Sequence, residues 1–291
     1  MSAPCDYQGK RRAGRHDGGS GGDWPIIGLA TKPSLQLSSD LVLGVCFPAM
    51  SETLADDLDE RAACVPHAIH PDGFNTGADL PYGLTTGHVR LAMQEFQDFL
   101  GFINTQLNSK DIQRFESMIM PASFSSLVGE FAVSSIPKYC TALVKNQYHN
   151  GHPDLIPAGR FPNNAVQHSE HGIEVKGSRY QRGWQGHNPE RCWLLVFIFD
   201  SNRPVDVAKG IGPKPFRYMC VVGAQLERED WLFAGRSATS RRTITASVQP
   251  SGFAKMMSNW IYRDPCTSPI AMAVPVQKSL AGLASDNEEE Q

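Results

Sequence analysis

The hydrophobic pattern of this 291-residue chain changes at Pro137 from helical to strand spacing. From Val89 to Ile103, apolar residues recur at intervals of three and four, which is the period of one buried helix face. After Pro137, the apolar residues fall in short runs that suit strands. Helices followed by a sheet with few intervening helices predict an α/β fold, on the border of α+β.

Three helices are expected in the first half of the chain, each with apolar residues at helical spacing on one side. The first begins at a cap formed by Thr85 or Thr86. The second is expected at residues 111–118, with Ile112 directed inward, and the third at about 123–134.

The second half is expected to hold strands and one final helix at 251–260. The candidate strands are 141–145, 165–168, 172–176, 193–200, 216–226 and 243–248. The run at 193–200 is the most apolar of them.

Composition divides the chain into four parts. Residues 1–23 are rich in Gly, Ser, Arg and Asp without periodicity, which predicts a disordered tail. Residues 24–119 are expected to form a mostly helical N-terminal part, and residues 120–265 a core that holds the strands. Residues 266–291 form a C-terminal tail whose acidic end is expected to be disordered.

The overall composition is that of an ordinary globular protein, with 20% charged and 41% hydrophobic residues. No run approaches the eighteen or more apolar residues of a membrane span, and no basic segment followed by an apolar core opens the chain. We therefore expect a cytoplasmic protein. The 7 cysteines are odd in number and scattered without a CxxC, which argues against a disulfide framework and a zinc–cysteine site.

Two carboxylates and a lysine carry the functional signal. Asp154 follows a proline, and Glu174 and Lys176 come twenty and twenty-two residues later. Side chains alternate along a strand, so Glu174 and Lys176 share one face while Ile173 and Val175 point into the core. Two carboxylates brought together can hold a hard divalent cation, usually Mg²⁺. A lysine ammonium beside them can position a water and offset negative charge that develops on a phosphate.

This arrangement resembles the PD-(D/E)xK nuclease superfamily, whose fold is restriction-endonuclease-like. The resemblance covers roughly residues 120–250, including the order of a helix, a strand with the Asp, a strand with ExK and a further apolar strand. It implies a mixed sheet flanked by helices, with Asp154, Glu174 and Lys176 as catalytic residues. It also implies that Asp154 and Glu174 bind Mg²⁺, for which Mn²⁺ substitutes. Many members use a helix carboxylate as an extra ligand, which would be Glu130 here; a solvated helix residue is the alternative interpretation.

Charge is distributed unevenly along the chain. Residues 26–137 carry 5 Lys and Arg against 13 Asp and Glu, whereas residues 138–263 carry 17 against 9. The basic half holds the carboxylates, which is the footprint expected for a polyanionic substrate. Two domains that differ in surface charge are the alternative.

Two polar clusters in the basic half are candidate DNA-binding segments. Planar side chains suit base edges, and Arg interleaved with Ser and Thr suits phosphates. The residues expected to contact DNA are Arg179, Arg182, Gln185 and Asn188 in the loop after Lys176, and Arg236, Arg241 and Arg242 in a second cluster. A solvated loop and a hairpin turn are the alternatives.

Four histidines, His149, His152, His168 and His171, form two HxxH pairs. Imidazole suits zinc, but HxxH places both rings on one side only in a helix, and neighbouring Gly and Pro residues argue against a helix at the first pair. A zinc site, contacts to phosphate and plain surface turns all remain open.

The sequence therefore predicts a Mg²⁺-dependent DNA endonuclease, most similar to a type II restriction endonuclease. It is expected to act on double-stranded DNA as a homodimer, because cutting two strands calls for two-fold symmetry. Two other classes remain open. One is a DNA-binding protein of the same fold without catalysis, and the other is a metal hydrolase that acts on a small substrate through the histidines.

Overall fold

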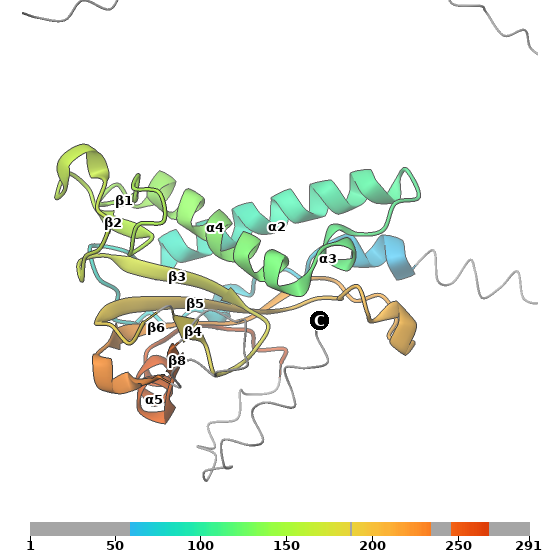
Figure 1. Ribbon diagram of the computed structural model, residues 1–291. Coiled ribbons are helices and arrows are strands. Elements are labelled where there is room, and N and C mark those ends of the chain that lie inside the picture. The colour runs from blue at the N-terminus through green and yellow to red at the C-terminus, as the bar shows by residue number, and fades with distance from the viewer. Residues whose placement is uncertain (1–58, 187, 234–245, 268–291) are drawn as a thin grey trace, which may run out of the picture. The chain divides into compact units, whose positions relative to one another are not determined.

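A six-stranded mixed sheet is the central element of the computed structural model, which describes residues 59–186, 188–233 and 246–267 (Figure 1). Neighbouring strands β3 and β5 run parallel, and the other neighbouring pairs of this sheet run antiparallel. The strands, in spatial order, are β1 (Leu143–Lys145), β2 (Leu155–Pro157), β3 (Ile173–Ser178), β5 (Cys192–Asp200), β6 (Arg217–Leu226) and β9 (Trp260–Arg263). The mixed α/β class agrees with the expectation from the sequence.

Both faces of this sheet are covered. On one face lie α2 (Thr86–Asn108) and α4 (Pro121–Tyr139), which are the long green helices above β3 and β5 in Figure 1. The other face packs against α5 (Pro250–Ser258) and a small second sheet. That sheet has the order β4 (Gln185–Gly186), β8 (Ala246–Val248) and β7 (Trp231–Phe233).

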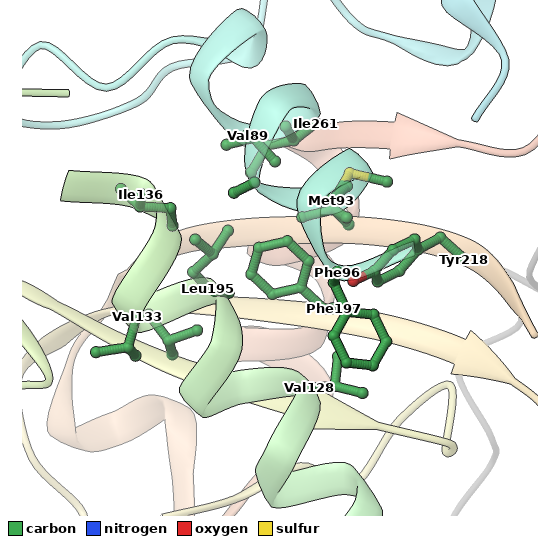
Figure 2. Close-up of a cluster of buried hydrophobic side chains, with 14 of the residues drawn as sticks. Val89, Met93, Phe96, Val128, Val133, Ile136, Leu195, Phe197, Tyr218 and Ile261 are labelled. Carbon is green, nitrogen blue, oxygen red and sulfur yellow. The ribbon is translucent and has the colours of Figure 1, made fainter. Parts of the chain in front are cut away.

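Strand β5 is buried on both sides, which explains its uninterrupted apolar sequence. Leu195 and Phe197 point to the helices, whereas Leu194 and Val196 point to the second sheet and α5. Figure 2 shows Phe96 of α2 beside Leu195 and Phe197 in the first of these two cores.

The first helix prediction is confirmed at its start. The Thr85 hydroxyl accepts a hydrogen bond from the His88 backbone N–H at 3.2 Å, and His88 Nδ1 in turn accepts from the Thr85 N–H at 3.3 Å. The two bonds satisfy amide groups that have no partner within the helix. The third predicted helix is also present, but α4 is longer at both ends than the expected 123–134.

The second helix prediction is wrong for the first half of its length. Only Phe115–Met118 is helical, as the short α3. Asp111 has a φ of 57°, a left-handed conformation that a right-handed helix does not accommodate, and Ile112 is exposed rather than inward. Asn104 Oδ1 accepts a hydrogen bond from the Phe115 N–H at 2.8 Å, so a side chain of α2 caps the start of α3.

Several strand predictions need correction. Residues 165–168 do not form a strand; a 3-10 turn at Pro162–Asn164 precedes them, and only a single parallel bridge joins His152 to His168. The short strands β2 and β9 were not among the candidates. Positions 243–245, like the predicted tail at 1–23 and the acidic end of the chain, lie outside the described residues.

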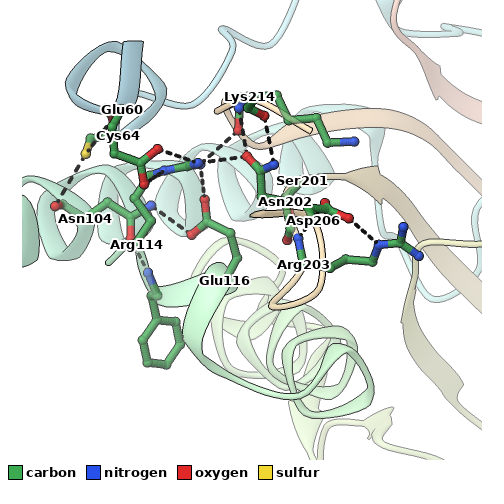
Figure 3. Close-up of polar contacts among 12 residues, drawn as sticks. Glu60, Cys64, Asn104, Arg114, Glu116, Ser201, Asn202, Arg203, Asp206 and Lys214 are labelled. Atoms are coloured by element: carbon green, nitrogen blue, oxygen red, sulfur yellow. Dashed lines mark hydrogen bonds and ion pairs between the residues drawn. The ribbon is translucent and has the colours of Figure 1, made fainter. Parts of the chain in front are cut away.

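A buried polar cluster joins the start of the described chain to the region after β5 (Figure 3). Arg114 is 2% exposed and donates to both Glu60 and Glu116 carboxylates, at 3.1 and 2.8 Å. It also donates to Asn202 Oδ1 at 2.7 Å and to the Lys214 carbonyl at 2.9 Å. The guanidinium is thus fully paired within the fold, and its role is structural.

Among the described residues, no helix combines the length and the apolar character needed to cross a bilayer.

Candidate active site

Asp154, Glu174 and Lys176 come together where β2 and β3 begin. Asp154 directly precedes β2, and the pairing of Leu155 with Ile173 sets it beside β3. Its Oδ2 accepts a hydrogen bond from the Val175 N–H at 2.9 Å. Lys176 Nζ donates to Glu174 Oε1 at 2.8 Å. The alternation expected along β3 therefore places the carboxylate and the ammonium on one face, while Val175 packs into the core on the other.

Burial and mutual repulsion give the carboxyl groups of Asp154 and Glu174 different pKa values. Burial, followed by the negative charge of Glu174, raises the pKa of Asp154 to about 7. Burial alone would raise the pKa of Glu174 too, but His152 and Lys176 outweigh it and hold that pKa at about 2. Burial would lower the pKa of Lys176, yet the two carboxylates raise it above its usual range. Near neutral pH the site thus holds one firmly ionised carboxylate, one ammonium and one carboxyl close to its titration point.

His152 links the carboxylates to a second group of side chains. Its Nδ1 lies 3.0 Å from Glu174 Oε2, and its Nε2 lies 3.4 Å from Glu190 Oε1. His168 Nδ1 lies 3.5 Å from Glu190 Oε2, and the two imidazole rings stack with centroids 5.4 Å apart. The structure therefore joins one histidine from each HxxH pair, whereas His149 and His171 are exposed in turns.

Glu190 was not identified from the sequence, although a signal for it existed. It precedes β5 by two residues, and β5 runs parallel to β3. Parallel neighbours begin at the same edge of a sheet, so a carboxylate just before β5 lies near the start of β3.

Asn146 holds the segments that carry these groups, a role that no sequence pattern indicates. Its Nδ2 donates to the carbonyls of Pro153 and Val166, at 3.0 and 2.8 Å. Its Oδ1 accepts from the N–H groups of Tyr148 and Val166, both at 3.1 Å. Its own backbone N–H donates to the Asp154 carbonyl at 2.8 Å. One buried amide thereby fixes the peptide before β2 and the loop that leads to His168.

Two glycines let α4 approach β3 closely beside the site. A Cβ atom on Gly177 would lie 2.3 Å from the Ser125 carbonyl oxygen, and one on Gly129 would lie 3.1 Å from the Gly177 nitrogen. Glu130 follows directly on α4, and its Oε2 lies 2.9 Å from Lys145 Nζ.

A cavity of about 1040 Å³ opens between α4, the segment after β1 and the start of β3. Asp154, Glu174, Lys176, Glu130 and Lys145 all contribute to its wall. Glu130 thus shares this cavity with the two carboxylates, although it forms an ion pair with Lys145 and both of these side chains are exposed.

Arg179 supports the fold rather than lining this cavity. Its guanidinium donates to the carbonyls of Ser201 and Asn202 at 2.8 and 3.2 Å. It also lies over the rings of Phe124 and Phe199, 5.3 and 5.0 Å from their centroids. A smaller cavity of about 200 Å³ adjoins it.

The rest of the polar loop, which is the segment after Lys176 that holds Arg179 to Asn188, is more exposed to solvent. Trp184 is buried and anchors the loop through an Nε1–H bond to the Tyr180 carbonyl at 2.9 Å. Arg182, Gln185 and Asn188 are exposed, and Gln185 lies in β4. The other three candidate DNA contacts, Arg236, Arg241 and Arg242, lie outside the described residues.

Comparisons with protein-family models, with curated proteins and with solved structures found no match for this chain. Its function must therefore be inferred from the site itself, which combines two close carboxylates, a charged lysine and a pair of histidines facing a third carboxylate.

Proposed function

We propose that this protein is a Mg²⁺-dependent endonuclease that hydrolyses phosphodiester bonds in DNA. The observation that carries the proposal is the convergence of Asp154, Glu174 and Lys176 on the wall of one open cavity. Asp154 comes from a different segment than Glu174 and Lys176, and all three side chains are largely buried, so holding them together costs desolvation free energy. Such costly groupings of charge are concentrated at functional sites.

The donor set fits Mg²⁺. Asp154 and Glu174 offer carboxylate oxygens, which are the ligands that this hard cation prefers. Burial and the charge of Glu174 raise the pKa of Asp154. A cation bound between the two carboxyls would offset both effects and favour the ionised form of Asp154. Bound Mg²⁺ would polarise the scissile phosphate and lower the pKa of the attacking water.

Lys176 has the position and charge state for the remaining role. Its raised pKa keeps the side chain protonated, and the 2.8 Å contact with Glu174 fixes the ammonium before substrate binds. A preorganised cation orients the water and stabilises the charge that develops on the phosphate. Glu130 remains a candidate for an additional cation ligand, because it lies on the wall of the same cavity.

The topology supports a restriction-endonuclease-like fold. A helix (α4) crosses the sheet, β2 follows the Asp, β3 carries ExK and β5 lies parallel to β3. This is the order expected from the PD-(D/E)xK resemblance, and the inference from fold to activity is by analogy. A type II-like enzyme that acts on double-stranded DNA as a homodimer follows from the same analogy.

Within that proposal, the exposed side chains of the polar loop are the candidates for base contacts. Arg182, Gln185 and Asn188 keep this role, since they are accessible and planar. Arg179 is assigned to the fold because its guanidinium binds two backbone carbonyls. Phosphate contacts are proposed for Arg236, Arg241 and Arg242.

The test is cleavage of supercoiled plasmid with and without Mg²⁺. We expect nicked and linear products only when Mg²⁺ or Mn²⁺ is present, with cut ends that T4 DNA ligase can reseal. The proposal would be refuted if the same amount of cleaved product formed in excess chelator as with Mg²⁺. It would also be refuted if plasmids of varied sequence stayed intact at every cation concentration.

A further inference from the structure

His152, His168 and Glu190 form a second cluster of possible metal ligands next to the carboxylate pair. Each offers one donor atom, and these atoms all lie within 4.8 Å of one another. They come from three separate segments, ahead of β2, β3 and β5. We propose that these three residues bind one divalent transition-metal ion, for which Zn²⁺ is the best-suited probe. The proposal does not depend on nuclease activity.

The chemistry of the donors distinguishes this site from the proposed Mg²⁺ site. Two imidazole nitrogens and one carboxylate oxygen form a set that suits zinc and related metals, whereas Mg²⁺ takes oxygen ligands. Asp154 and Glu174 supply oxygen only. The two neighbouring sites therefore differ in the kind of cation they would take.

Two of the separations between donor atoms are close to those around a tetrahedral ion. Ligand atoms about 2.0–2.1 Å from a tetrahedral zinc lie about 3.3 Å from one another. His152 Nε2 lies 3.4 Å from Glu190 Oε1, and His168 Nδ1 lies 3.5 Å from Glu190 Oε2. The two contacts use different oxygens of Glu190, so a shared ion would draw the three donor atoms, which lie within 4.8 Å of one another, closer together.

The orientation of His152 is already that of a metal ligand. Its Nδ1 lies 3.0 Å from Glu174 Oε2, which assigns the proton of the neutral ring to Nδ1 and leaves the lone pair on Nε2. Its Nε2 is buried and has no hydrogen-bond partner among the described residues. A carboxylate that accepts from one nitrogen while the other binds metal is the usual second-shell arrangement around zinc.

A simple ion pair does not account for all of this geometry. A protonated His152 could lie between Glu174 and Glu190 without any metal. In that arrangement His168 would have no part, yet its ring stacks on His152 with an interplanar angle of 18° and its Nδ1 faces Glu190. His168 is 58% exposed at its side chain, which leaves an entry path for the ion.

The contribution of His168 therefore separates the two accounts. The experiment is calorimetric titration of the metal-free full chain with Zn²⁺ and no DNA, together with thermal unfolding. We expect one Zn²⁺ per chain from this site and a zinc-dependent rise in Tm, because an ion that binds only the folded state stabilises it. His168→Ala and Glu190→Gln should each weaken Zn²⁺ binding at least ~10-fold and remove that rise.

Two controls make the result specific. His171→Ala removes an exposed histidine three residues from His168 and should bind Zn²⁺ as the wild type does. Mg²⁺ titrations of His168→Ala should match the wild type if the sites are separate. Absence of Zn²⁺ binding by the wild type, or wild-type affinity in both His168→Ala and Glu190→Gln, would overturn the proposal. A failure of DNA cleavage would not affect these measurements.

Discussion

Glu174 accepts a contact from His152 Nδ1 at 3.0 Å through Oε2, while its other oxygen binds Lys176. One carboxylate therefore connects the proposed phosphodiester-cleaving group to the histidine cluster. A substitution at His152 should alter the orientation and basicity of the Glu174 carboxylate, because a hydrogen-bonded neighbour positions and tunes a metal ligand.

The first prediction concerns pH. Burial and then Glu174 raise the pKa of Asp154 from its usual 3.8 to about 7. A raised carboxyl pKa favours the protonated folded state, so the associated stability is complete below pH 3.8 and is lost as the pH rises through about 7. Mg²⁺ requires the ionised form, so its affinity should fall about tenfold per pH unit below 7.

Mg²⁺ titrations between pH 5 and pH 8 measure this effect. Burial lowers the pKa of His152, but Glu174 and other neighbours raise it overall, so its protonation acts in the same direction. The slope that remains in His152→Gln therefore belongs to the carboxyl pair of Asp154 and Glu174. A Mg²⁺ affinity that does not change below pH 7 in that variant would contradict the assignment.

The second prediction concerns Lys176. Lys176→Ala should lower kcat for plasmid cleavage at least ~100-fold, because it removes a preorganised charge from the developing transition state. Lys145→Ala is the matched control, since it removes an exposed lysine from the wall of the same cavity. We expect it to affect KM more than kcat. Equal losses of kcat in the two variants would contradict a role for Lys176 in stabilising the transition state.

The third prediction concerns Asn146. Asn146→Ala should lower the free energy of unfolding by ~1–3 kcal/mol, because several backbone groups lose a buried partner. It should also weaken Mg²⁺ binding, since the peptide that carries Asp154 loosens. Gln147→Ala, at an exposed neighbour, should change stability by less than ~0.5 kcal/mol. Denaturant unfolding tests the pair, and wild-type stability in Asn146→Ala would contradict the argument.

The fourth prediction concerns the cluster around Arg114. Arg114→Ala should cost ~3–5 kcal/mol of unfolding free energy, because it leaves the fully buried Glu116 without its cationic partner. Arg160→Ala, at an exposed arginine, should cost less than ~0.5 kcal/mol. Urea denaturation curves of the two variants compare them directly. A small loss in Arg114→Ala would show that the cluster relaxes around the missing group.

The parts of the fold that were predicted correctly depend on local sequence. The Thr85 cap and the apolar face of α2 are encoded within a few residues of each other. The strand at 193–200 is apolar throughout because both its faces are covered. The prediction of the second helix was wrong at its start because Asp111 takes a left-handed conformation, which helix propensity does not specify.

The candidate site was only partly predictable for a similar reason. Glu174 and Lys176 are two residues apart on one strand, so their shared face follows from alternation alone. Glu190 and Asn146 reach the site through strand pairing and loop packing, which short spacings do not encode. The partnership of His152 with His168 arises from a single bridge between two loops.

The most direct test of the central claim compares plasmid cleavage by the wild type with that by Asp154→Asn and Glu174→Gln. Glu170→Gln is the control, because it neutralises a carboxylate that is 54% exposed and lies outside the site. We predict that both site variants fold, as judged by circular dichroism, and lose Mg²⁺-dependent cleavage, while Glu170→Gln cleaves like the wild type. Cleavage near the wild-type rate by folded Asp154→Asn and Glu174→Gln would contradict the account.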